Sequence, residues 1–224
     1  MSRNQIGIVQ PVSKKDQVVT LIRQAIIRGQ LTSGEAIVES RIGQEIGAGT
    51  ALVREALIDL EYQGFVQKVP YKGTYVTRLS RQDYDAIFRL RRELEALAVG
   101  WAMERITPAD LDELERLTEV MKQGAAAQDR RQFYEHDLAF HQRIWLASGN
   151  AWLGEALERL VLPLFAFFLM KTPRTTEQYL ESAAKHAEIV AAMRAGDRAA
   201  VNTLMRSSVG TWQEDMLPTL FPET

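Results

Sequence analysis

The chain has 224 residues, of which 46% are hydrophobic and 25% charged, a balance typical of globular proteins with one large or two small domains. It has no cysteine, which excludes disulfides, thiolate metal ligands and cysteine nucleophiles. No apolar run approaches the roughly 18 residues needed to cross a bilayer and no signal-peptide pattern opens the chain, so we expect a cytoplasmic protein with no membrane partner.

The net charge of −2 is unevenly distributed along the chain. Residues 1–78 hold ten Lys and Arg against seven Asp and Glu, whereas residues 79–224 hold seventeen against twenty-two. A basic N-terminal part joined to an acidic remainder is typical of a nucleic-acid-binding module with a second domain. Chance variation in surface charge explains so small a difference equally well.

The first 78 residues predict three helices followed by a β-hairpin. Apolar residues recur at helical spacing in three segments. These segments are bounded by capping and stop residues at Ser13 and Gly29, at Glu39 or Ser40 and Gly47, and at Thr50 and Gly64. Residues 65–69 and 74–77 are strand-like runs on either side of a turn. This order predicts a winged helix-turn-helix domain at residues 1–78.

From residue 79 the pattern is helical to the end, which predicts an all-α bundle of six helices at residues 79–224. The helices are expected to start at Ser80, Thr107-Pro108, Asp129, Asn150, Thr175 or Thr176, and Asp197. In the first helix, apolar residues recur at 3-4-3-4 spacing, as in a stripe that faces a core: Ile87, Leu90, Leu94, Leu97 and Trp101. We expect prolines to bend the fourth helix, to end it and to follow the end of the last one: Pro163, Thr172-Pro173 and Pro218.

The third helix and the hairpin hold the candidate DNA contacts. In a helix-turn-helix, the third helix presents its N-terminal residues to the major groove. The helix N-terminus at Thr50 attracts a phosphate, and Arg54, one turn further, can reach a guanine or a phosphate. Lys72 and Gly73 lie at the predicted wing tip, and Arg41 lies at the start of the second helix, where basic side chains can meet phosphates.

Residues 17–78 resemble the winged helix of the GntR family of bacterial transcription regulators. The matching pieces follow one another in order: Ile26-Ile27-Arg28-Gly29-Gln30-Leu31 with Gly34, Val53-Arg54-Glu55-Ala56-Leu57, Leu60-Glu61, Gly64-Phe65-Val66, and Lys72-Gly73. The resemblance implies binding to double-stranded operator DNA. Because paired winged helices read paired half-sites, we also expect a homodimer.

One departure from the family pattern affects base recognition. The family places Ser-Arg-Thr-Pro where this chain has Gly49-Thr50-Ala51-Leu52, so a base-reading arginine is absent. Losing one bidentate contact costs about 1–3 kcal/mol of discrimination, while phosphate contacts can maintain bulk affinity. We therefore expect DNA binding with an altered operator. The alternatives are that Arg54 only pairs with Glu55 or Glu61, or that the module no longer binds DNA.

Polar side chains interrupt the apolar stripes of three C-terminal helices, at Asp137, His186 and Ser208, and His141 lies one turn beyond Asp137. Buried polar groups need partners, and those on facing helices of a bundle often converge on a metal or ligand. Asp137 and His141 project from one helix face, and with His186 they suit zinc, nickel or manganese. The alternative is that these residues hydrogen-bond to one another within the core.

Residues 80–215 resemble the FCD ligand-sensing domain of the FadR subfamily of these regulators. The matching pieces are Leu90-Arg91 with Glu95, residues 137–141, Gly149-Asn150, Lys185-His186 and Gly196-Asp197. In that family an Asp and three His bind a divalent metal that helps to hold a small carboxylate. The first three ligands carry over as Asp137, His141 and His186, but Ser208 stands where the fourth histidine is expected. The resemblance therefore implies either a weakened metal site or a metal-free site for an organic molecule.

The candidate contacts to the small organic effector are Arg91, Asn150 and Ser208. Arg91 flanks the apolar stripe of its helix and is a natural partner for a carboxylate. Its alternative role is a surface ion pair with Glu95 at the favourable i, i+4 spacing.

Two other functions compete with the regulator. One is a metal-dependent hydrolase built on Asp137, His141 and His186; the other is an interaction module with a winged helix that does not bind DNA. The sequence has no nucleophile elbow, phosphate loop or glycine-rich cofactor fingerprint. A hydrolase would also leave the winged helix unexplained. The sequence therefore predicts a ligand-controlled transcription regulator and not an enzyme.

Overall fold

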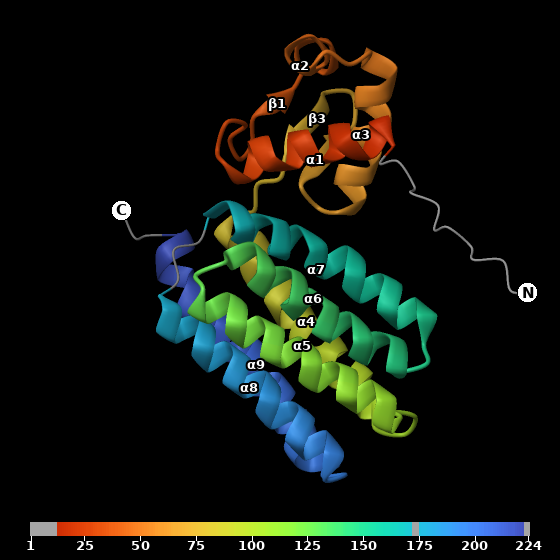
Figure 1. The fold of residues 1–224 in the computed structure, drawn as a ribbon, viewed down its shortest axis with the longest axis vertical. Helices are drawn as coiled ribbons and strands as arrows, with labels where there is room; N and C mark the ends of the chain where they lie inside the picture. Colours follow the sequence, from red (N-terminus) through yellow and green to blue (C-terminus); the bar gives the residue numbers. More distant parts are fainter. Residues whose placement is uncertain (1–12, 172–174, 222–224) are drawn as a thin grey trace, which may run out of the picture. The chain divides into compact units, whose positions relative to one another are not determined.

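The computed structural model describes residues 13–171 and 175–221, and the chain divides into two compact units, residues 1–76 and 77–224. Among the described residues it contains nine helices and three short strands. The strands are confined to the N-terminal unit, and the C-terminal unit is built of long helices (Figure 1). This is the predicted fold class, and the predicted elements follow one another in the predicted order, with one short strand in addition.

The N-terminal unit is a three-helix domain with a small antiparallel sheet. Its elements are α1 (Lys14–Ile27), β1 (Ala36–Ile37), α2 (Glu39–Ile46), α3 (Thr50–Tyr62), β2 (Val66–Val69) and β3 (Gly73–Val76). The strand order is β1-β3-β2, and in the hairpin Val66 pairs with Val76 and Val69 with Gly73. The sequence analysis missed β1, because two residues are too short to show strand alternation.

The turn between α2 and α3 depends on two glycines. A Cβ on Gly43 would lie 2.6 Å from the backbone oxygen of Ala48, whose N–H donates to the Gly43 carbonyl at 2.8 Å. Gly47 ends α2 at φ +68°, a conformation that favours glycine. These two positions allow α3 to start immediately after α2, as a helix-turn-helix requires.

The helix starts of this unit are predicted correctly except for one cap. Ser13 Oγ accepts a hydrogen bond from the Asp16 N–H at 3.0 Å and caps α1 as expected. Thr50 does not cap α3: it is the first helical residue, Gly49 is the N-cap, and no side chain bonds the first turn. The prediction was wrong because Gly49 already has the extended backbone that a cap residue adopts, with ψ 147°.

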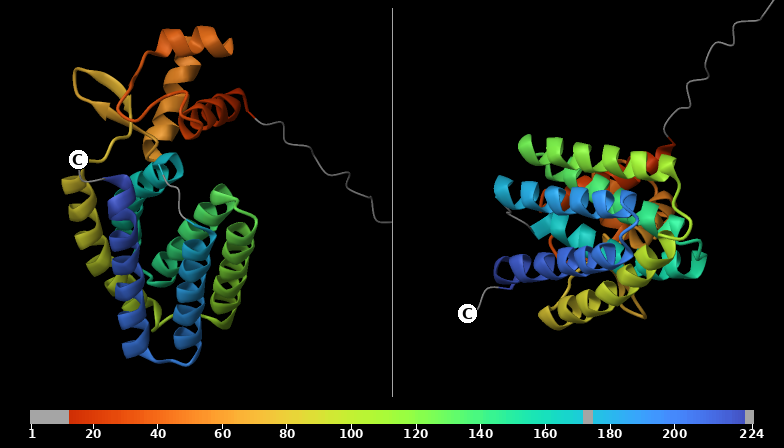
Figure 2. Two further views of the ribbon diagram at one scale, coloured as in Figure 1. Left: turned by 90° about the vertical axis from the view of Figure 1, so that its left-hand side faces the viewer. Right: turned by 90° about the horizontal axis from the view of Figure 1, so that it is seen from below.

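The C-terminal unit is a bundle of six helices. They are α4 (Arg81–Ala102), α5 (Pro108–Ala126), α6 (Arg130–Ala147), α7 (Ala151–Lys171), α8 (Thr176–Arg194) and α9 (Arg198–Leu220). Capping boxes at Ser80, Thr107 and Thr175 confirm three of the predicted starts. Helix α4 packs against α6, α7 and α9, and α8 packs against α5 and α9 (Figure 2).

One proline interrupts its helix less than predicted. Helix α9 continues through Pro218 to Leu220, so the expected stop before Pro218 was wrong. A proline in the last turn removes only one hydrogen bond, and Pro218 is exposed, where water can serve the freed carbonyl. Helix α7 contains Pro163 in its interior, which agrees with the expectation that the helix continues past it, and the predicted bend stays a prediction. The predicted end at Thr172-Pro173 lies outside the described residues.

The core of the bundle confirms most of the predicted inner faces but reverses one. Phe133, Phe140 and Ile144 of α6 are fully buried, as the periodicity predicted. In α4 three residues of the expected inward stripe face outward: Leu90 is 49% exposed, Leu97 47% and Trp101 38%, whereas Ile87 and Leu94 are half-buried against the core. The buried face of α4 instead includes Tyr84, Phe88, Arg91, Glu95 and Val99. Helix α4 has two apolar faces, and periodicity alone does not tell which one is inside.

No helix within the described ranges combines the length and the apolar character needed to span a membrane.

Candidate functional site

Helix α3 presents an exposed face that begins at its uncapped N-terminus. Because no side chain caps its first turn, the N–H groups there are available to a phosphate. Thr50, Ala51 and Arg54 are exposed on this face, and Ile58 is 61% exposed one turn further along. The face that a recognition helix uses is therefore free of contacts with the domain core.

Arg54 is exposed but paired. Its Nε lies 3.1 Å from both carboxylate oxygens of Glu39, and its Nη2 donates to Glu39 Oε2 at 2.7 Å. This hydrogen-bonded pairing lowers the pKa of Glu39. The sequence offers Glu55 and Glu61 on the same helix as alternative partners, but the observed partner, Glu39, comes from α2. An exposed ion pair is worth about 0–1 kcal/mol, so a phosphate or base can replace Glu39 at little cost.

The other predicted DNA contacts lie on the surface of the same unit. Arg41 donates to Glu35 at 2.9 Å and lies 3.8 Å from Glu45. Lys72 and Gly73 are exposed where the hairpin turns into β3. Beside them stands a residue that the sequence analysis did not select: Tyr71 is fully exposed at φ +63°, a conformation that a non-glycine residue rarely adopts. An aromatic residue in a predicted wing turn was the available signal.

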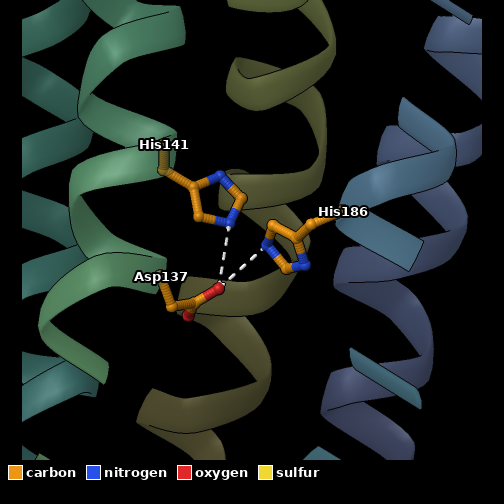
Figure 3. A group of neighbouring side chains, drawn as sticks. All are labelled: Asp137, His141 and His186. Carbon is orange, nitrogen blue, oxygen red and sulfur yellow. Dashed lines mark ion pairs between the residues drawn. The ribbon is translucent and has the colours of Figure 1, made fainter. Parts of the chain in front are cut away.

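Three of the predicted metal ligands meet in the core of the C-terminal unit. Helix α6 contributes Asp137 and His141 and helix α8 contributes His186, all at 3% exposure or less. One potential ligand atom from each side chain lies within 4.8 Å of the other two. Asp137 Oδ1 is 2.8 Å from His186 Nε2 and 3.9 Å from His141 Nε2, and Figure 3 shows both imidazoles directed toward the carboxylate.

The tautomer of His186 is fixed by a backbone contact. Its Nδ1 lies 2.7 Å from the carbonyl oxygen of Ser182, and because that oxygen only accepts, Nδ1 carries the proton. In the neutral imidazole, Nε2 then directs a lone pair at Asp137 Oδ1. Two electron-rich atoms at this distance repel each other, so the contact requires either a proton on Nε2 or a cation between the groups.

A second carboxylate, Glu95 of α4, contacts the ring nitrogen of His141 that does not face Asp137. Its Oε1 lies 3.0 Å from His141 Nδ1, and its Oε2 accepts a hydrogen bond from Trp145 Nε1 at 2.8 Å. Burial alone would raise the pKa of Glu95, but the neighbouring His141, Arg91 and Trp145 outweigh it and lower that pKa to about 2. A carboxylate behind an imidazole is the common way in which proteins orient a metal-binding histidine.

Arg91 pairs with Glu95, but not on the surface. Its side chain is 4% exposed, its Nε donates to Glu95 Oε1 at 3.2 Å, and its guanidinium lies over the rings of Phe88 and Phe165. The alternative of a surface ion pair was therefore right about the partner and wrong about the location. Spacing identifies an i, i+4 partner but not which face of the helix is buried.

The charge around the two histidines favours a cation. Burial works against ionisation of Asp137, but His186, His141 and Arg91 outweigh it and lower the pKa of Asp137. Glu95 is also ionised, because its pKa is held at about 2. With neutral imidazoles, the two carboxylates and Arg91 leave one net negative charge in a buried region.

The three effector candidates do not all meet. Arg91 and Ser208 line a cavity of about 10 Å³ together with the metal-ligand candidates and Trp212. That volume is comparable to the space needed for one water molecule. Asn150 lies elsewhere: its Oδ1 accepts from the Leu153 N–H at 3.0 Å at the start of α7, and it lines a separate hollow. The structure therefore brings Arg91 and Ser208 to the candidate metal centre and leaves Asn150 outside it.

These residues fit a divalent cation. Asp137 Oδ1 and His186 Nε2 are buried and make no hydrogen bond of acceptable geometry among the described residues. Two imidazoles and a carboxylate suit zinc, nickel or manganese. Ser208, a poor ligand, stands at the expected fourth position, so the protein supplies three good donors instead of four.

Comparison with known proteins agrees with both units. A sequence profile described as bacterial regulatory proteins, gntR family, matches residues 14–76, and the FCD domain profile matches residues 86–211. The HTH-type transcriptional regulator McbR of Escherichia coli K12 is 30% identical over 69% of this chain and 70% of McbR. The HTH-type transcriptional repressor GlaR of the same strain is 29% identical over 85% of this chain and 90% of GlaR.

A solved structure shows the same architecture. The E. coli McbR/YncC structure superposes with a TM-score of 0.72 at 24% identity, covering 92% of this chain and 98% of that chain. The matched relatives named here are transcription regulators and not enzymes. The chain therefore belongs to the GntR family of bacterial regulatory proteins, as a DNA-binding transcription regulator with a C-terminal FCD domain.

Proposed function

We propose that this regulator holds a divalent metal at Asp137, His141 and His186, and that a small organic acid at this site controls its affinity for operator DNA. The observation that carries the proposal is the 2.8 Å contact between Asp137 Oδ1 and His186 Nε2, two atoms that require a positive charge between or upon them. Glu95 orients His141, and Ser182 fixes the tautomer of His186.

A metal with three protein ligands keeps coordination positions that a carboxylate can fill, which is the chemistry such an ion supplies. The protein adds a negative site for the cation and, through Arg91, a guanidinium that lines the same cavity. Arg91 is engaged with Glu95, so an incoming carboxylate competes with Glu95 for it. Ser208 offers a hydroxyl as a weaker contact.

The size of the cavity connects ligand binding to movement. About 10 Å³ accommodates one water molecule but not an organic acid, so the acid enters only if side chains such as Arg91 or Trp212 move. Arg91 belongs to α4, and four residues separate the end of β3 from the start of this helix. A ligand that binds the opened cavity more tightly than this closed one shifts the population of the two states, which is the condition for control.

On the DNA side, the proposal assigns phosphate or base contacts to the exposed surface of the winged helix: Arg41, Thr50, Arg54, Lys72 and Gly73. Two copies are required to read a two-fold operator, so the regulator acts as a homodimer. Its action on DNA in a bacterium places it in the cytoplasm.

The metal is tested by measuring zinc, nickel and manganese content in untagged protein and by calorimetric titration of metal-stripped protein. We expect about one metal per chain, lost in His186→Ala. The matched control is His136→Ala. The chain has three histidines, and His136 is the one that lies outside the site, where its Nδ1 contacts the Gln132 carbonyl. If the wild type contains and binds none of these metals, a proton bridges His186 and Asp137 and the proposal fails.

The control of DNA binding is tested by gel shift on the DNA upstream of the chain's own gene. We expect the stripped and zinc-loaded proteins to respond differently to a panel of small mono- and dicarboxylic acids, with the response abolished in His186→Ala and retained in His136→Ala. A panel that leaves the shift unchanged in the zinc-loaded protein would contradict control by an organic acid.

A further inference from the structure

The outer face of α3 carries apolar side chains along its central line. Ala51 is exposed, and Ile58, seven residues further along the helix, is 61% exposed. Seven residues make close to two helical turns, so the two side chains leave the helix in nearly the same direction. The opposite side of α3 is buried and includes Val53, Ala56 and Leu60. Both apolar side chains therefore lie on the face that α3 presents to the major groove.

The polar side chains of α3 limit which bases the helix can recognise by hydrogen bonds. Bidentate contacts to guanine come from Arg or Lys, and those to adenine come from Asn or Gln. Residues 50–62 include one arginine, Arg54, and no Lys, Asn or Gln. Glu55, exposed beside it, can accept a hydrogen bond from cytosine. These two side chains suit a G·C pair, and no side chain of α3 makes a bidentate contact with adenine.

The start of α3 permits a close approach to the bases. Gly49, Thr50 and Ala51 have small side chains or none, and all three are exposed. A Cβ on Gly49 would meet no atom within 4 Å, and its φ of −68° suits any residue, so the fold of this unit does not require glycine there. Because no long side chain surrounds Ala51, its methyl group can reach the floor of a groove.

We propose that Ala51 and Ile58 contact the C5-methyl groups of thymine in the major groove, so that α3 selects T·A pairs in the half-site where Arg54 contacts guanine. Thymine presents an apolar group in this groove, and apolar side chains recognise it by contact. A rise of 1.5 Å per residue places Ala51 and Ile58 about 10 Å apart along the helix, far enough to reach different base pairs. The inference rests on the proposed function for the contact between α3 and DNA, and it names the bases that this contact selects.

Uracil in place of thymine tests the methyl contact, because the two bases differ only in that group. The duplex that the protein prefers is first selected from a random pool and then prepared with uracil at every thymine position. One buried methyl-sized group changes an affinity by about fourfold. A two-fold operator offers two such contacts in each half-site. We therefore expect the uracil duplex to bind about 10-fold or more weakly in fluorescence anisotropy at a fixed salt concentration.

Three variants show whether the named side chains make the contact. Ile58→Ala and Ala51→Gly each remove apolar atoms from the outer face of α3. We expect each to lower the ratio of the affinities for the thymine and uracil duplexes by about fourfold or more, because a methyl group has lost its partner. The control is Leu21→Ala, which removes a 49% exposed aliphatic side chain from α1 and should keep the wild-type ratio. Circular dichroism should show the wild-type helix content in all three variants.

The outcomes separate this inference from the proposed function. Equal affinities for the thymine and uracil duplexes, or a wild-type ratio in both Ile58→Ala and Ala51→Gly, overturn the contact with thymine while DNA binding itself stands. A selected duplex without thymine in its half-sites does the same. If selection enriches no sequence, the proposed function fails and this inference fails with it. A metal-free protein that shows the expected ratios supports the inference and refutes the proposed metal control.

Discussion

Replacing Glu95 by Gln removes a buried negative charge that contacts His141 on α6 and Arg91 on α4 itself. Folding holds the pKa of this carboxyl at about 2, against an ordinary value of 4.5. A lowering of that size corresponds to about 3 kcal/mol of stability at neutral pH. We therefore expect the free energy of unfolding of E95Q at pH 7 to be lower by about 3 kcal/mol, with the unpaired guanidinium of Arg91 acting in the same direction.

The effect of E95Q has a defined dependence on pH. A carboxylate whose pKa is lowered by folding contributes fully above its unfolded pKa, and the contribution is lost as the pH falls through the folded pKa. For Glu95 that window runs from about 4.5 down to about 2. The difference between wild type and E95Q should therefore be largest near neutral pH and shrink steadily below it.

Tryptophan fluorescence during urea unfolding provides the assay, because all four tryptophans lie in the C-terminal unit. The matched control is Glu93→Gln on the same helix, whose exposed carboxylate pairs with Arg206 at 2.6 Å. That surface pair should change stability by less than about 1 kcal/mol. If the free energies of unfolding of E95Q and wild type fall in parallel between neutral and acid pH, the contacts of Glu95 with His141 and Arg91 do not stabilise its charged form in the folded protein.

The remaining predictions concern the affinity for DNA, the turn between α2 and α3, and the affinity for zinc. Arg54→Ala should weaken binding to operator DNA by about 1–3 kcal/mol in fluorescence anisotropy, whereas Glu39→Gln should strengthen it modestly by releasing Arg54; equal affinities for the three proteins would contradict the role of Arg54. Gly43→Ala should destabilise the N-terminal unit by about 1–3 kcal/mol in thermal unfolding, because its Cβ would meet a backbone oxygen at 2.6 Å, and an unchanged melting temperature would show that the turn can yield. Ser208→His should tighten zinc binding in calorimetry by adding a third imidazole as the fourth protein ligand, and an unchanged affinity would remove Ser208 from the metal's surroundings.

Local chemistry explains which parts of the fold the sequence predicted. Ser13, Ser80 and Thr107 cap helices because a hydroxyl at that position serves an unpaired N–H, whatever surrounds it. The inner stripes of α6 and α8 were also predictable, because the residues that these helices bury recur at helical spacing. The polar residues within those faces, Asp137 and His186, could then be recognised as a candidate site.

Tertiary packing determines which face of α4 is buried, and the sequence pattern does not reveal this. Helix α4 has two apolar faces, and the bundle buries the one that also carries Arg91 and Glu95. Spacing alone favoured the outer stripe, three of whose residues are exposed. A sequence does not distinguish a buried ion pair from a surface pair, because the i, i+4 spacing is the same in both cases.

Contacts between different secondary-structure elements could likewise not be predicted from the sequence. Arg54 binds Glu39, which lies on another helix and becomes a neighbour only when α2 and α3 pack. Strand β1 has two residues and exists only because β3 offers it an edge. Neither contact leaves a periodic signal in the sequence.

The most direct test of the central claim is the affinity of the wild-type protein for the DNA upstream of its gene, measured by anisotropy against a scrambled duplex over a series of salt concentrations. A specific regulator should bind the upstream DNA about 1,000-fold or more tightly, with an affinity that falls as salt rises. Equal affinity for the two duplexes at every salt concentration would contradict the account.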